Sequence, residues 1–209
     1  MVIDLVDENF EIEYSQKGYK YMAGIDEVGR GALFGDVVAA AVIMPQGSEI
    51  EGIRDSKKLS EKKRDRFYEI ILNEAVAVGI GRIEASVIDE INIKEATKLA
   101  MLQAVDNLRD KDGNKVFADL LLIDAETIDT DIDQVPIIKG DDRCYSISCA
   151  SIVAKVYRDR LCIKWGERYP KYGIEKHKGY GTKFHREAIK DFGPSEMHRM
   201  SFIKNKENW

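Results

Sequence analysis

Residues 23–31, Ala-Gly-Ile-Asp-Glu-Val-Gly-Arg-Gly, combine the residue types best suited to chemistry on a phosphate. Asp26 and Glu27 follow an apolar run that is typical of a strand, and hard divalent cations prefer carboxylate oxygens as ligands. The two glycines that flank Arg30 let backbone N–H groups approach a ligand closely, and the guanidinium offers a fork that suits phosphate. This pattern indicates metal-assisted chemistry on a phosphate-bearing polymer.

Two further acids follow short apolar runs, Asp124 after residues 119–123 and Asp141 after residues 135–138. Sites in open α/β sheets gather at strand ends, so three strands can deliver carboxylates to one point. Two cations about 4 Å apart can activate a water and stabilise a leaving oxygen. The residues alone leave alternatives, because both acids also suit helix N-caps or turns and Asp142 competes with Asp141.

Asp26 and Glu27 can bind the same metal ion only under one geometric condition. Neighbouring side chains on a regular strand point to opposite faces. Asp26 and Glu27 can therefore reach one metal only if the strand ends or distorts beside them, and Gly29 makes such a distortion plausible.

The elements that must position these acids can be read from the hydrophobic pattern. Strands are expected over residues 19–28, 37–44, 76–83, 119–123 and 135–138, and helices over 60–73, 86–108 with a break near 92–93, 147–165 and 183–192. Strands followed by helix–strand alternation predict an α/β domain with a mixed sheet. We expect an N-terminal arm over residues 1–19 and one catalytic domain over residues 20–209 that includes a basic helical C-terminal part.

The composition of the chain indicates the kind of protein and its cellular compartment. The chain has 209 residues, 44% of them hydrophobic, which suits a folded domain with a sizeable core. Its three cysteines form no CxxC pair, which favours a reducing compartment over a disulfide framework. The acidic start is unlike a signal peptide, and no apolar run reaches the roughly 18 residues of a membrane helix. We therefore expect a cytoplasmic protein with no membrane partner.

The charge distribution favours a nucleic-acid partner despite the net charge of −5. Residues 155–209 hold 14 Lys and Arg against 7 Asp and Glu, whereas the rest of the chain is acidic. A basic third can bind phosphates while the remainder stays acidic. An uneven but merely solvated surface is the alternative.

Six segments together resemble the ribonuclease HII family, in the same order and over roughly residues 20–203. They are Gly24–Gly31 (GIDEVGRG), Asp55–Ser60 (DSKKLS), Leu122–Asp124 with Lys139–Asp141, Ser151–Val156 (SIVAKV), His177–Tyr180 (HKGY) and the closing run from Gly193-Pro194 to His198–Phe202. Several segments in order are far more specific than any one of them.

The resemblance implies a ribonuclease H-like fold, with a mixed five-stranded sheet flanked by helices and a helical C-terminal extension. It implies cleavage of RNA in RNA/DNA hybrids and incision 5′ of single ribonucleotides in duplex DNA, leaving 5′-phosphate and 3′-hydroxyl ends. It assigns Mg²⁺ or Mn²⁺ to Asp26, Glu27, Asp124 and Asp141, which selects Asp141 over Asp142. The residues that it assigns to the substrate are Gly29, Arg30, Gly31, Lys57, Lys178 and Tyr180.

Three positions depart from the family pattern: Ala32 and Gly181 stand where proline is usual, and Ala125 where glycine is usual. None removes a carboxylate or Tyr180, so activity is expected to be retained. The alternatives are a ribonuclease HIII-like enzyme, which typically has a longer N-terminal extension and a glutamate as fourth acid, and a non-catalytic RNA/DNA-hybrid-binding protein. We expect a monomer that binds RNA/DNA hybrids and ribonucleotide-containing duplex DNA.

Overall fold

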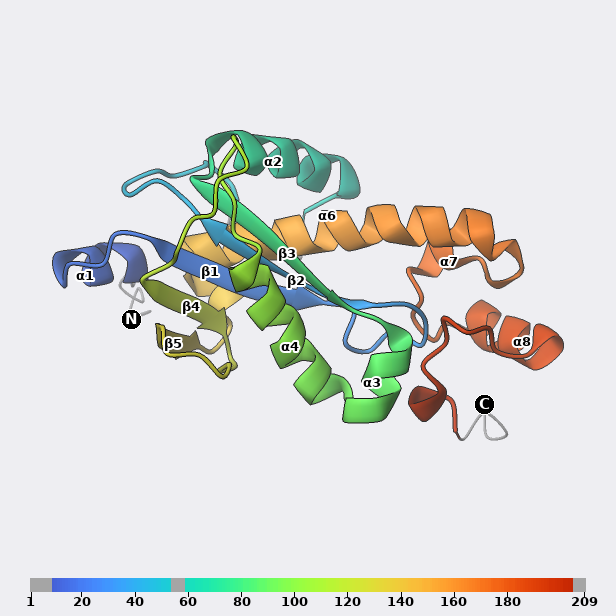
Figure 1. The fold of residues 1–209 in the computed structure, drawn as a ribbon. Coiled ribbons are helices and arrows are strands. Elements are labelled where there is room, and N and C mark those ends of the chain that lie inside the picture. The colour runs from blue at the N-terminus through green and yellow to red at the C-terminus, as the bar shows by residue number, and fades with distance from the viewer. Residues whose placement is uncertain (1–8, 54–58, 205–209) are drawn as a thin grey trace, which may run out of the picture.

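A five-stranded sheet forms the centre of the computed structural model, which describes residues 9–53 and 59–204 (Figure 1). The strand order is β3-β2-β1-β4-β5. The strands are β1 (Met22–Val28), β2 (Val37–Ile43), β3 (Ala77–Ile83), β4 (Leu120–Asp124) and β5 (Asp133–Ile137). The helices are α1 (Phe10–Gln16), α2 (Glu61–Glu74), α3 (Ala85–Ile91), α4 (Ile93–Asp106), α5 (Gly140–Arg143), α6 (Tyr145–Arg168), α7 (Ile174–His177) and α8 (Lys183–Phe192).

The sheet is mixed, as the sequence predicts. β1, β2 and β3 form an antiparallel meander, whereas β4 pairs parallel to β1 and β5 pairs parallel to β4. All seven residues of β2 are buried, as expected for a continuous run of small apolar side chains. Because β1 and β4 run parallel, their C-terminal ends lie at the same end of the sheet, so the residues at those ends can lie close together.

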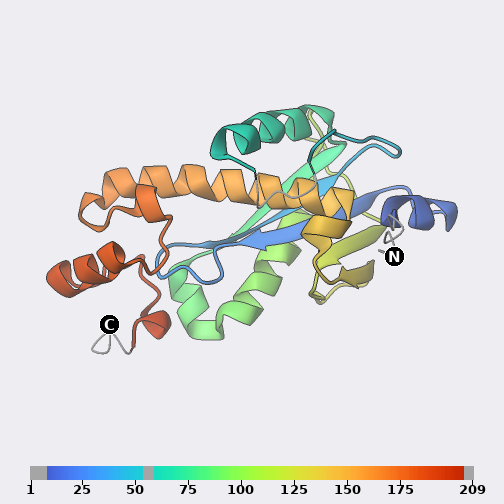
Figure 2. The same ribbon diagram turned by 180° about the vertical axis from the view of Figure 1, so that it is seen from behind.

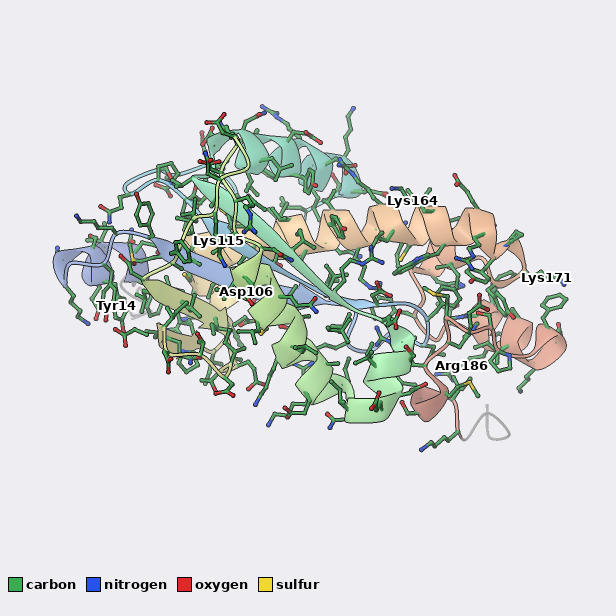
Figure 3. The ribbon with its side chains drawn as sticks, in the orientation of Figure 1. Tyr14, Asp106, Lys115, Lys164, Lys171 and Arg186 are labelled. Carbon is green, nitrogen blue, oxygen red and sulfur yellow. The ribbon has the colours of Figure 1, made fainter. Side chains whose placement is uncertain are left out.

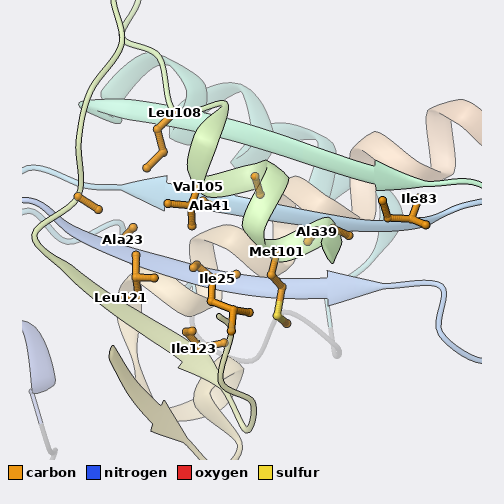
Figure 4. Packing of buried hydrophobic residues seen from close by; sticks show 14 of the residues in the cluster. Ala23, Ile25, Ala39, Ala41, Ile83, Met101, Val105, Leu108, Leu121 and Ile123 are labelled. Atoms are coloured by element: carbon orange, nitrogen blue, oxygen red, sulfur yellow. The ribbon is translucent and has the colours of Figure 1, made fainter. Parts of the chain in front are cut away.

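Helices cover the two faces of the sheet. α3 and α4 lie on one face, and α2 and the long α6 lie on the other, as the two opposite views show (Figures 1 and 2). Alternate residues of β2 face the two helix layers. Ala39 and Ala41 pack in the same cluster as Met101 and Val105 of α4 (Figure 4). Ala40 instead packs in the cluster formed with α2 and α6.

Glycines let two helices lie directly on the sheet. A Cβ atom added to Gly79 or Gly81 of β3 would stand 2.0 or 1.9 Å from a carbonyl oxygen of α4, Ala104 or Ala100 respectively. A Cβ on Gly24 of β1 would stand 2.1 Å from the backbone of Ser146 in α6. These backbones are in contact, so the strands and helices cannot separate to admit a side chain.

Helix boundaries follow capping residues. Ser60 accepts a hydrogen bond from the Lys63 backbone at the start of α2. The predicted break near residue 92 is confirmed, because Asn92 has a φ of +70° and its side chain accepts from two backbone N–H groups of α4. The short helices α5 and α7 lack the length for a hydrophobic period, and the sequence patterns did not predict them.

The helical C-terminal part packs around the far end of α6. Phe34, which follows β1, is buried there with Trp165 of α6 and Ile189 of α8. Three basic residues, Lys164, Lys171 and Arg186, lie around the same end (Figure 3). None of the helices in the described part of the chain is long and apolar enough to cross a membrane.

The arm preceding β1 contributes a cap to the longest helix. Cys144 at the N-terminus of α6 makes no side-chain capping bond. The carboxylate of Glu11 in α1 supplies it instead, accepting from the Ser146 backbone N–H at 2.8 Å and from the Ser146 hydroxyl at 2.9 Å. A negative charge at this end also interacts favourably with the helix dipole. The arm is thereby tied to the start of α6.

We expect Glu11→Ala to lower the free energy of unfolding by about 1–2 kcal/mol, because α6 loses both its cap and a favourable charge. Urea denaturation followed by circular dichroism measures the loss. Glu13→Ala is the matched control, since Glu13 makes only an exposed pair with Lys17 and its removal should cost under about 0.5 kcal/mol. Equal losses in the two variants would contradict the capping role.

Candidate functional site

A cavity of about 450 Å³ opens at the end of the sheet where β1 and β4 stop. Its walls come from β1, the loop after it, α2, α6 and the segment after α7. The lining residues are Asp26, Glu27, Val28, Gly29, Arg30, Gly31, Arg64, Asp124, Ser151, Ile152, Lys155 and Tyr180. Three of the four predicted acids therefore meet at one place.

The parallel register of β1 and β4 explains this meeting. Ile25 pairs with Ile123, so the next residues, Asp26 and Asp124, come at the same level of the sheet. β4 ends at Asp124 while β1 continues, which leaves the acids of β1 beside an open edge. The expected end or distortion of β1 is not seen, because its pairing with β2 continues unbroken to Val28, yet Asp26 and Glu27 both line the cavity.

Each of the three carboxylates accepts at least one hydrogen bond from the protein. Asp26 Oδ1 accepts from the Glu27 backbone at 2.8 Å, and Glu27 Oε1 accepts from the Arg30 guanidinium at 3.2 Å. Asp124 Oδ1 accepts from the Gly140 backbone N–H at 2.7 Å. The second oxygen of Glu27, Oε2, is buried and has no hydrogen-bond partner among the residues that the structure describes.

The electrostatics reflect this crowding of acids. Burial raises the pKa of Asp26 well above its usual value, and the neighbouring charges of Glu27 and Asp124 raise it further, against a hydrogen bond from Ser151. Burial also raises the pKa of Glu27, while the nearby Arg30 lowers it. Desolvation and like charges thus disfavour the ionised cluster, and a cation placed among these oxygens would relieve both.

Asp141 lies behind the cavity and does not line it. It follows Gly140, the residue whose N–H binds Asp124, in the short turn of α5. Asp141 is 1% exposed, whereas Asp142 is exposed to solvent, so only Asp141 turns inward. Ala125, where the related family usually has glycine, has a φ of +51°. That is a left-handed conformation in which glycine is favoured.

The donor set fits a hard divalent cation, since it consists of carboxylate oxygens. In residues 9–53 and 59–204, no three His, Cys, Asp or Glu side chains already stand in a metal-binding arrangement. Asp26, Glu27 and Asp124 each turn an oxygen toward a protein donor in this structure. The buried, unbonded Glu27 Oε2 shows that the site has a ligand atom to offer.

The predicted substrate residues divide into three groups. Gly29, Arg30, Gly31 and Tyr180 line the cavity, and Tyr180 is 38% exposed. Lys178 does not line it, because its ammonium group donates to the Glu175 carbonyl at 2.8 Å. Lys57 lies outside the described residues.

Sequence reasoning assigned no role to the three other polar residues in this lining, Arg64, Ser151 and Lys155. Ser151 and Lys155 belong to the SIVAKV segment, and their spacing of four places them on one face of α6, which was an available signal. Arg64 comes from α2 and belongs to none of the segments that carry the resemblance, so only the fold reveals it. Arg64 and Lys155 add positive charge to the cavity wall, and Lys155 also pairs with Asp159 at 2.7 Å.

A chain of histidines supports the backbone of Tyr180. His198 Nδ1 accepts from the Ser195 backbone N–H at 2.9 Å, so its Nε2 carries the proton and donates to His185 Nε2 at 3.2 Å. His185 Nδ1 then donates to the Tyr180 carbonyl at 3.0 Å. Burial lowers the pKa of both rings to about 4.

Comparison with solved structures places the fold among the ribonucleases H. The ribonuclease H2 from Pyrococcus horikoshii OT3 superposes with a TM-score of 0.73 at 22% identity, covering 90% of this chain and 97% of that chain. Bst-RNase HIII in complex with Mn²⁺ superposes with a TM-score of 0.67 at 17% identity, covering 93% and 71% of the two chains. The chain therefore has a ribonuclease H-like fold.

Sequence comparison identifies the family to which the chain belongs. The model of the family Ribonuclease HII matches residues 23–205. Ribonuclease HII of Alkaliphilus metalliredigens (strain QYMF) is 59% identical over 189 residues, which are 90% of this chain and 93% of that protein. The chain belongs to the ribonuclease HII family, a family of divalent-metal-dependent nucleases that act on RNA/DNA substrates, and the ribonuclease HIII-like alternative is set aside.

We expect the histidine chain to make folding acid-sensitive. The folded pKa values of about 4 lie below the ordinary 6.5, so the unfolded chain binds protons first. Stability from this source is complete above pH 6.5 and is lost as the pH falls toward 4.

Urea denaturation at pH 7 and pH 5 measures the acid loss in the wild type and in His185→Gln. The variant lacks one titrating ring, so its loss between the two pH values should be smaller by about 1–2 kcal/mol. Identical losses would show that the histidines do not titrate as the structure indicates.

Proposed function

We propose that this protein hydrolyses RNA within RNA/DNA hybrids and incises duplex DNA on the 5′ side of a single ribonucleotide, leaving 5′-phosphate and 3′-hydroxyl ends. The observation that carries the proposal is the shared cavity: Asp26, Glu27 and Asp124 line it together with the Gly29–Gly31 loop and Tyr180. Acids suited to metal ions thus adjoin groups suited to reading a sugar.

In this proposal Asp26, Glu27, Asp124 and Asp141 hold Mg²⁺ or Mn²⁺. When bound, such ions supply an activated water and stabilise the charge that develops on the phosphate. Glu27 offers its buried Oε2, and Asp26 sits between Glu27 and Asp124 in the electrostatic cluster. Asp141 follows Gly140, the backbone donor to Asp124, so the start of α5 links the two acids.

The remaining lining residues bind and select the substrate. The backbone of Gly29–Gly31 reads the ribose 2′-hydroxyl, the group that distinguishes RNA from DNA. The exposed ring of Tyr180 stacks on the sugar at the junction between ribonucleotide and deoxyribonucleotide. Arg64 and Lys155 line the same cavity, and their positive charges attract the phosphate backbone.

We also propose a cytoplasmic, monomeric enzyme. All three cysteines are free and buried, which suits a reducing compartment.

The basic surface around the C-terminal end of α6 and around α8 is formed by segments that are close to Tyr180 in sequence. In this proposal the duplex extends from the cavity over that surface.

We expect Asp26→Asn to abolish cleavage of a duplex with one ribonucleotide, by at least about 100-fold, because it removes a charge from the metal ligands. Nicking is followed with and without Mg²⁺ or Mn²⁺, and binding is followed by fluorescence anisotropy. Binding should largely persist. The control is Asp142→Asn, an exposed acid nearby that should leave nicking unchanged. Loss of binding would indicate a structural role for Asp26, and wild-type protein that binds without nicking would support the non-catalytic alternative.

We expect Tyr180→Ala to slow incision at a lone ribonucleotide by about tenfold or more, since base or sugar stacking on an aromatic ring contributes about 1–3 kcal/mol. Cleavage of a continuous RNA/DNA hybrid should fall less, because a hybrid has no single junction to select. Tyr21→Ala replaces another exposed tyrosine, outside the cavity, and should change neither rate. A variant that incises the lone ribonucleotide normally would remove Tyr180 from the proposal.

A further inference from the structure

Arg158 is a fully buried cation at the centre of α6, and the proposed chemistry does not use it. Burying a charge is unfavourable unless hydrogen bonds compensate it. Asp36, whose carbonyl Arg158 contacts, directs its carboxylate to Arg82 instead, at 2.6 and 2.8 Å. The guanidinium of Arg158 must therefore be stabilised by other groups.

Three backbone carbonyls surround this guanidinium. Nε donates to the Asp36 carbonyl at 3.0 Å, and Nη2 donates to the Phe34 carbonyl at 3.1 Å. Nη1 donates to the Lys178 carbonyl at 2.8 Å. The first two carbonyls lie in the segment that follows the Gly29–Gly31 loop, and the third lies two residues before Tyr180. One side chain thus joins two segments that are more than 140 residues apart in the sequence.

The same guanidinium contacts the two proposed sugar-reading groups themselves. A Cβ on Gly29, which has a φ of +92°, would stand 2.3 Å from Arg158 Nε, so the loop rests directly on this side chain. The Tyr180 ring centroid is 5.8 Å from Arg158 Cζ, within range of a cation–π interaction. A backbone bond from Leu33 to Gly179, at 2.8 Å, runs alongside.

Arg158 does not line the cavity, so its charge does not face a substrate there. Its action is to hold the loop and the ring at a fixed separation. A lysine cannot replace it, because an ammonium point charge lacks the planar fork that reaches carbonyls in three directions.

We propose that Arg158 is a positioning residue that sets the distance between the Gly29–Gly31 loop and Tyr180, and thereby the preference for a lone ribonucleotide. This inference rests on the proposed function of that site. It adds that selectivity for the junction depends on a buried contact away from the substrate.

The test compares Arg158→Lys with the wild type on two substrates, a duplex with one ribonucleotide and a continuous RNA/DNA hybrid. The ratio of the two kcat/KM values should fall about tenfold or more, mainly through kcat, because misplaced groups lose transition-state contacts while phosphate binding persists. Met101→Ala, in the cluster on the other face of the sheet, is the control for lost stability. It should leave the ratio unchanged, and an unchanged ratio in Arg158→Lys would overturn the inference.

A double variant with Tyr180→Ala separates positioning from a general structural effect. If Arg158 acts through Tyr180, the two losses are non-additive and the double variant resembles Tyr180→Ala alone. Additive losses would overturn the inference. Should Arg158→Lys fail to fold by circular dichroism, Arg158→Gln, which keeps a planar donor, takes its place. Failure of both to fold would show that Arg158 holds the fold itself, which also overturns it. Wild-type protein that cleaves only the continuous hybrid would instead refute the proposed function.

Discussion

Repulsion among carboxylates at the ends of β1 and β4 is the constraint that the rest of this structure has to satisfy. Asp26, Glu27 and Asp124 gather in one partly enclosed cavity, where burial and like charge both raise the pKa of Asp26. Such a cluster cannot arise from local preference, because each acid would be more stable in water. The surrounding sheet and helices must be rigid enough to hold the acids together, and the same rigidity prepares the site for cations.

That rigidity comes from backbone contacts and buried cations rather than from large side chains. α6 lies directly on β1 at Gly24 and continues to the C-terminal helices. A single helix therefore extends from the region of the acids to the region of Tyr180. Arg199 supplements Arg158 by donating to the carbonyls of Arg30 and Gly35, both at 2.9 Å. The loop after β1 is thus held from two sides by arginines that donate to main-chain oxygens. Contacts of this kind to the main chain hold a loop in place and leave its own side chains available for substrate.

The sequence predicts the strands and long helices well because their signals are local. The all-apolar β2, the cap at Ser60, the break at Asn92 and the helix at 183–192 match the structure closely. The mixed sheet is also confirmed, and the family resemblance led to the correct family. Residues 120–124 and 22–28 read as strands separately, but only their parallel register explains why Asp26 and Asp124 meet.

The parts that could not be predicted depend on distant partners. α5 is too short for a hydrophobic period, so residue patterns give no sign of which acid turns inward, and only the family resemblance selected Asp141 over Asp142. Glu11 is one acid among many, and its capping role exists only because α6 begins beside it. Lys178 was expected to contact phosphate from its place in a motif, yet its ammonium group binds the Glu175 carbonyl. For Asp141 and Glu11, tertiary packing that no single segment encodes decides what the side chain contacts, whereas the Lys178 bond is to a residue only three positions earlier.

The glycines beneath α4 and α6 have a consequence for protein engineering. Replacing glycine with alanine is a common route to a more heat-resistant protein, because it restricts the denatured chain. At Gly24, Gly79 and Gly81 the added methyl group would collide with a neighbouring backbone at about 2 Å. Directed-evolution libraries that aim at thermostability should therefore leave these three codons unvaried and draw their substitutions from the solvent-facing helices.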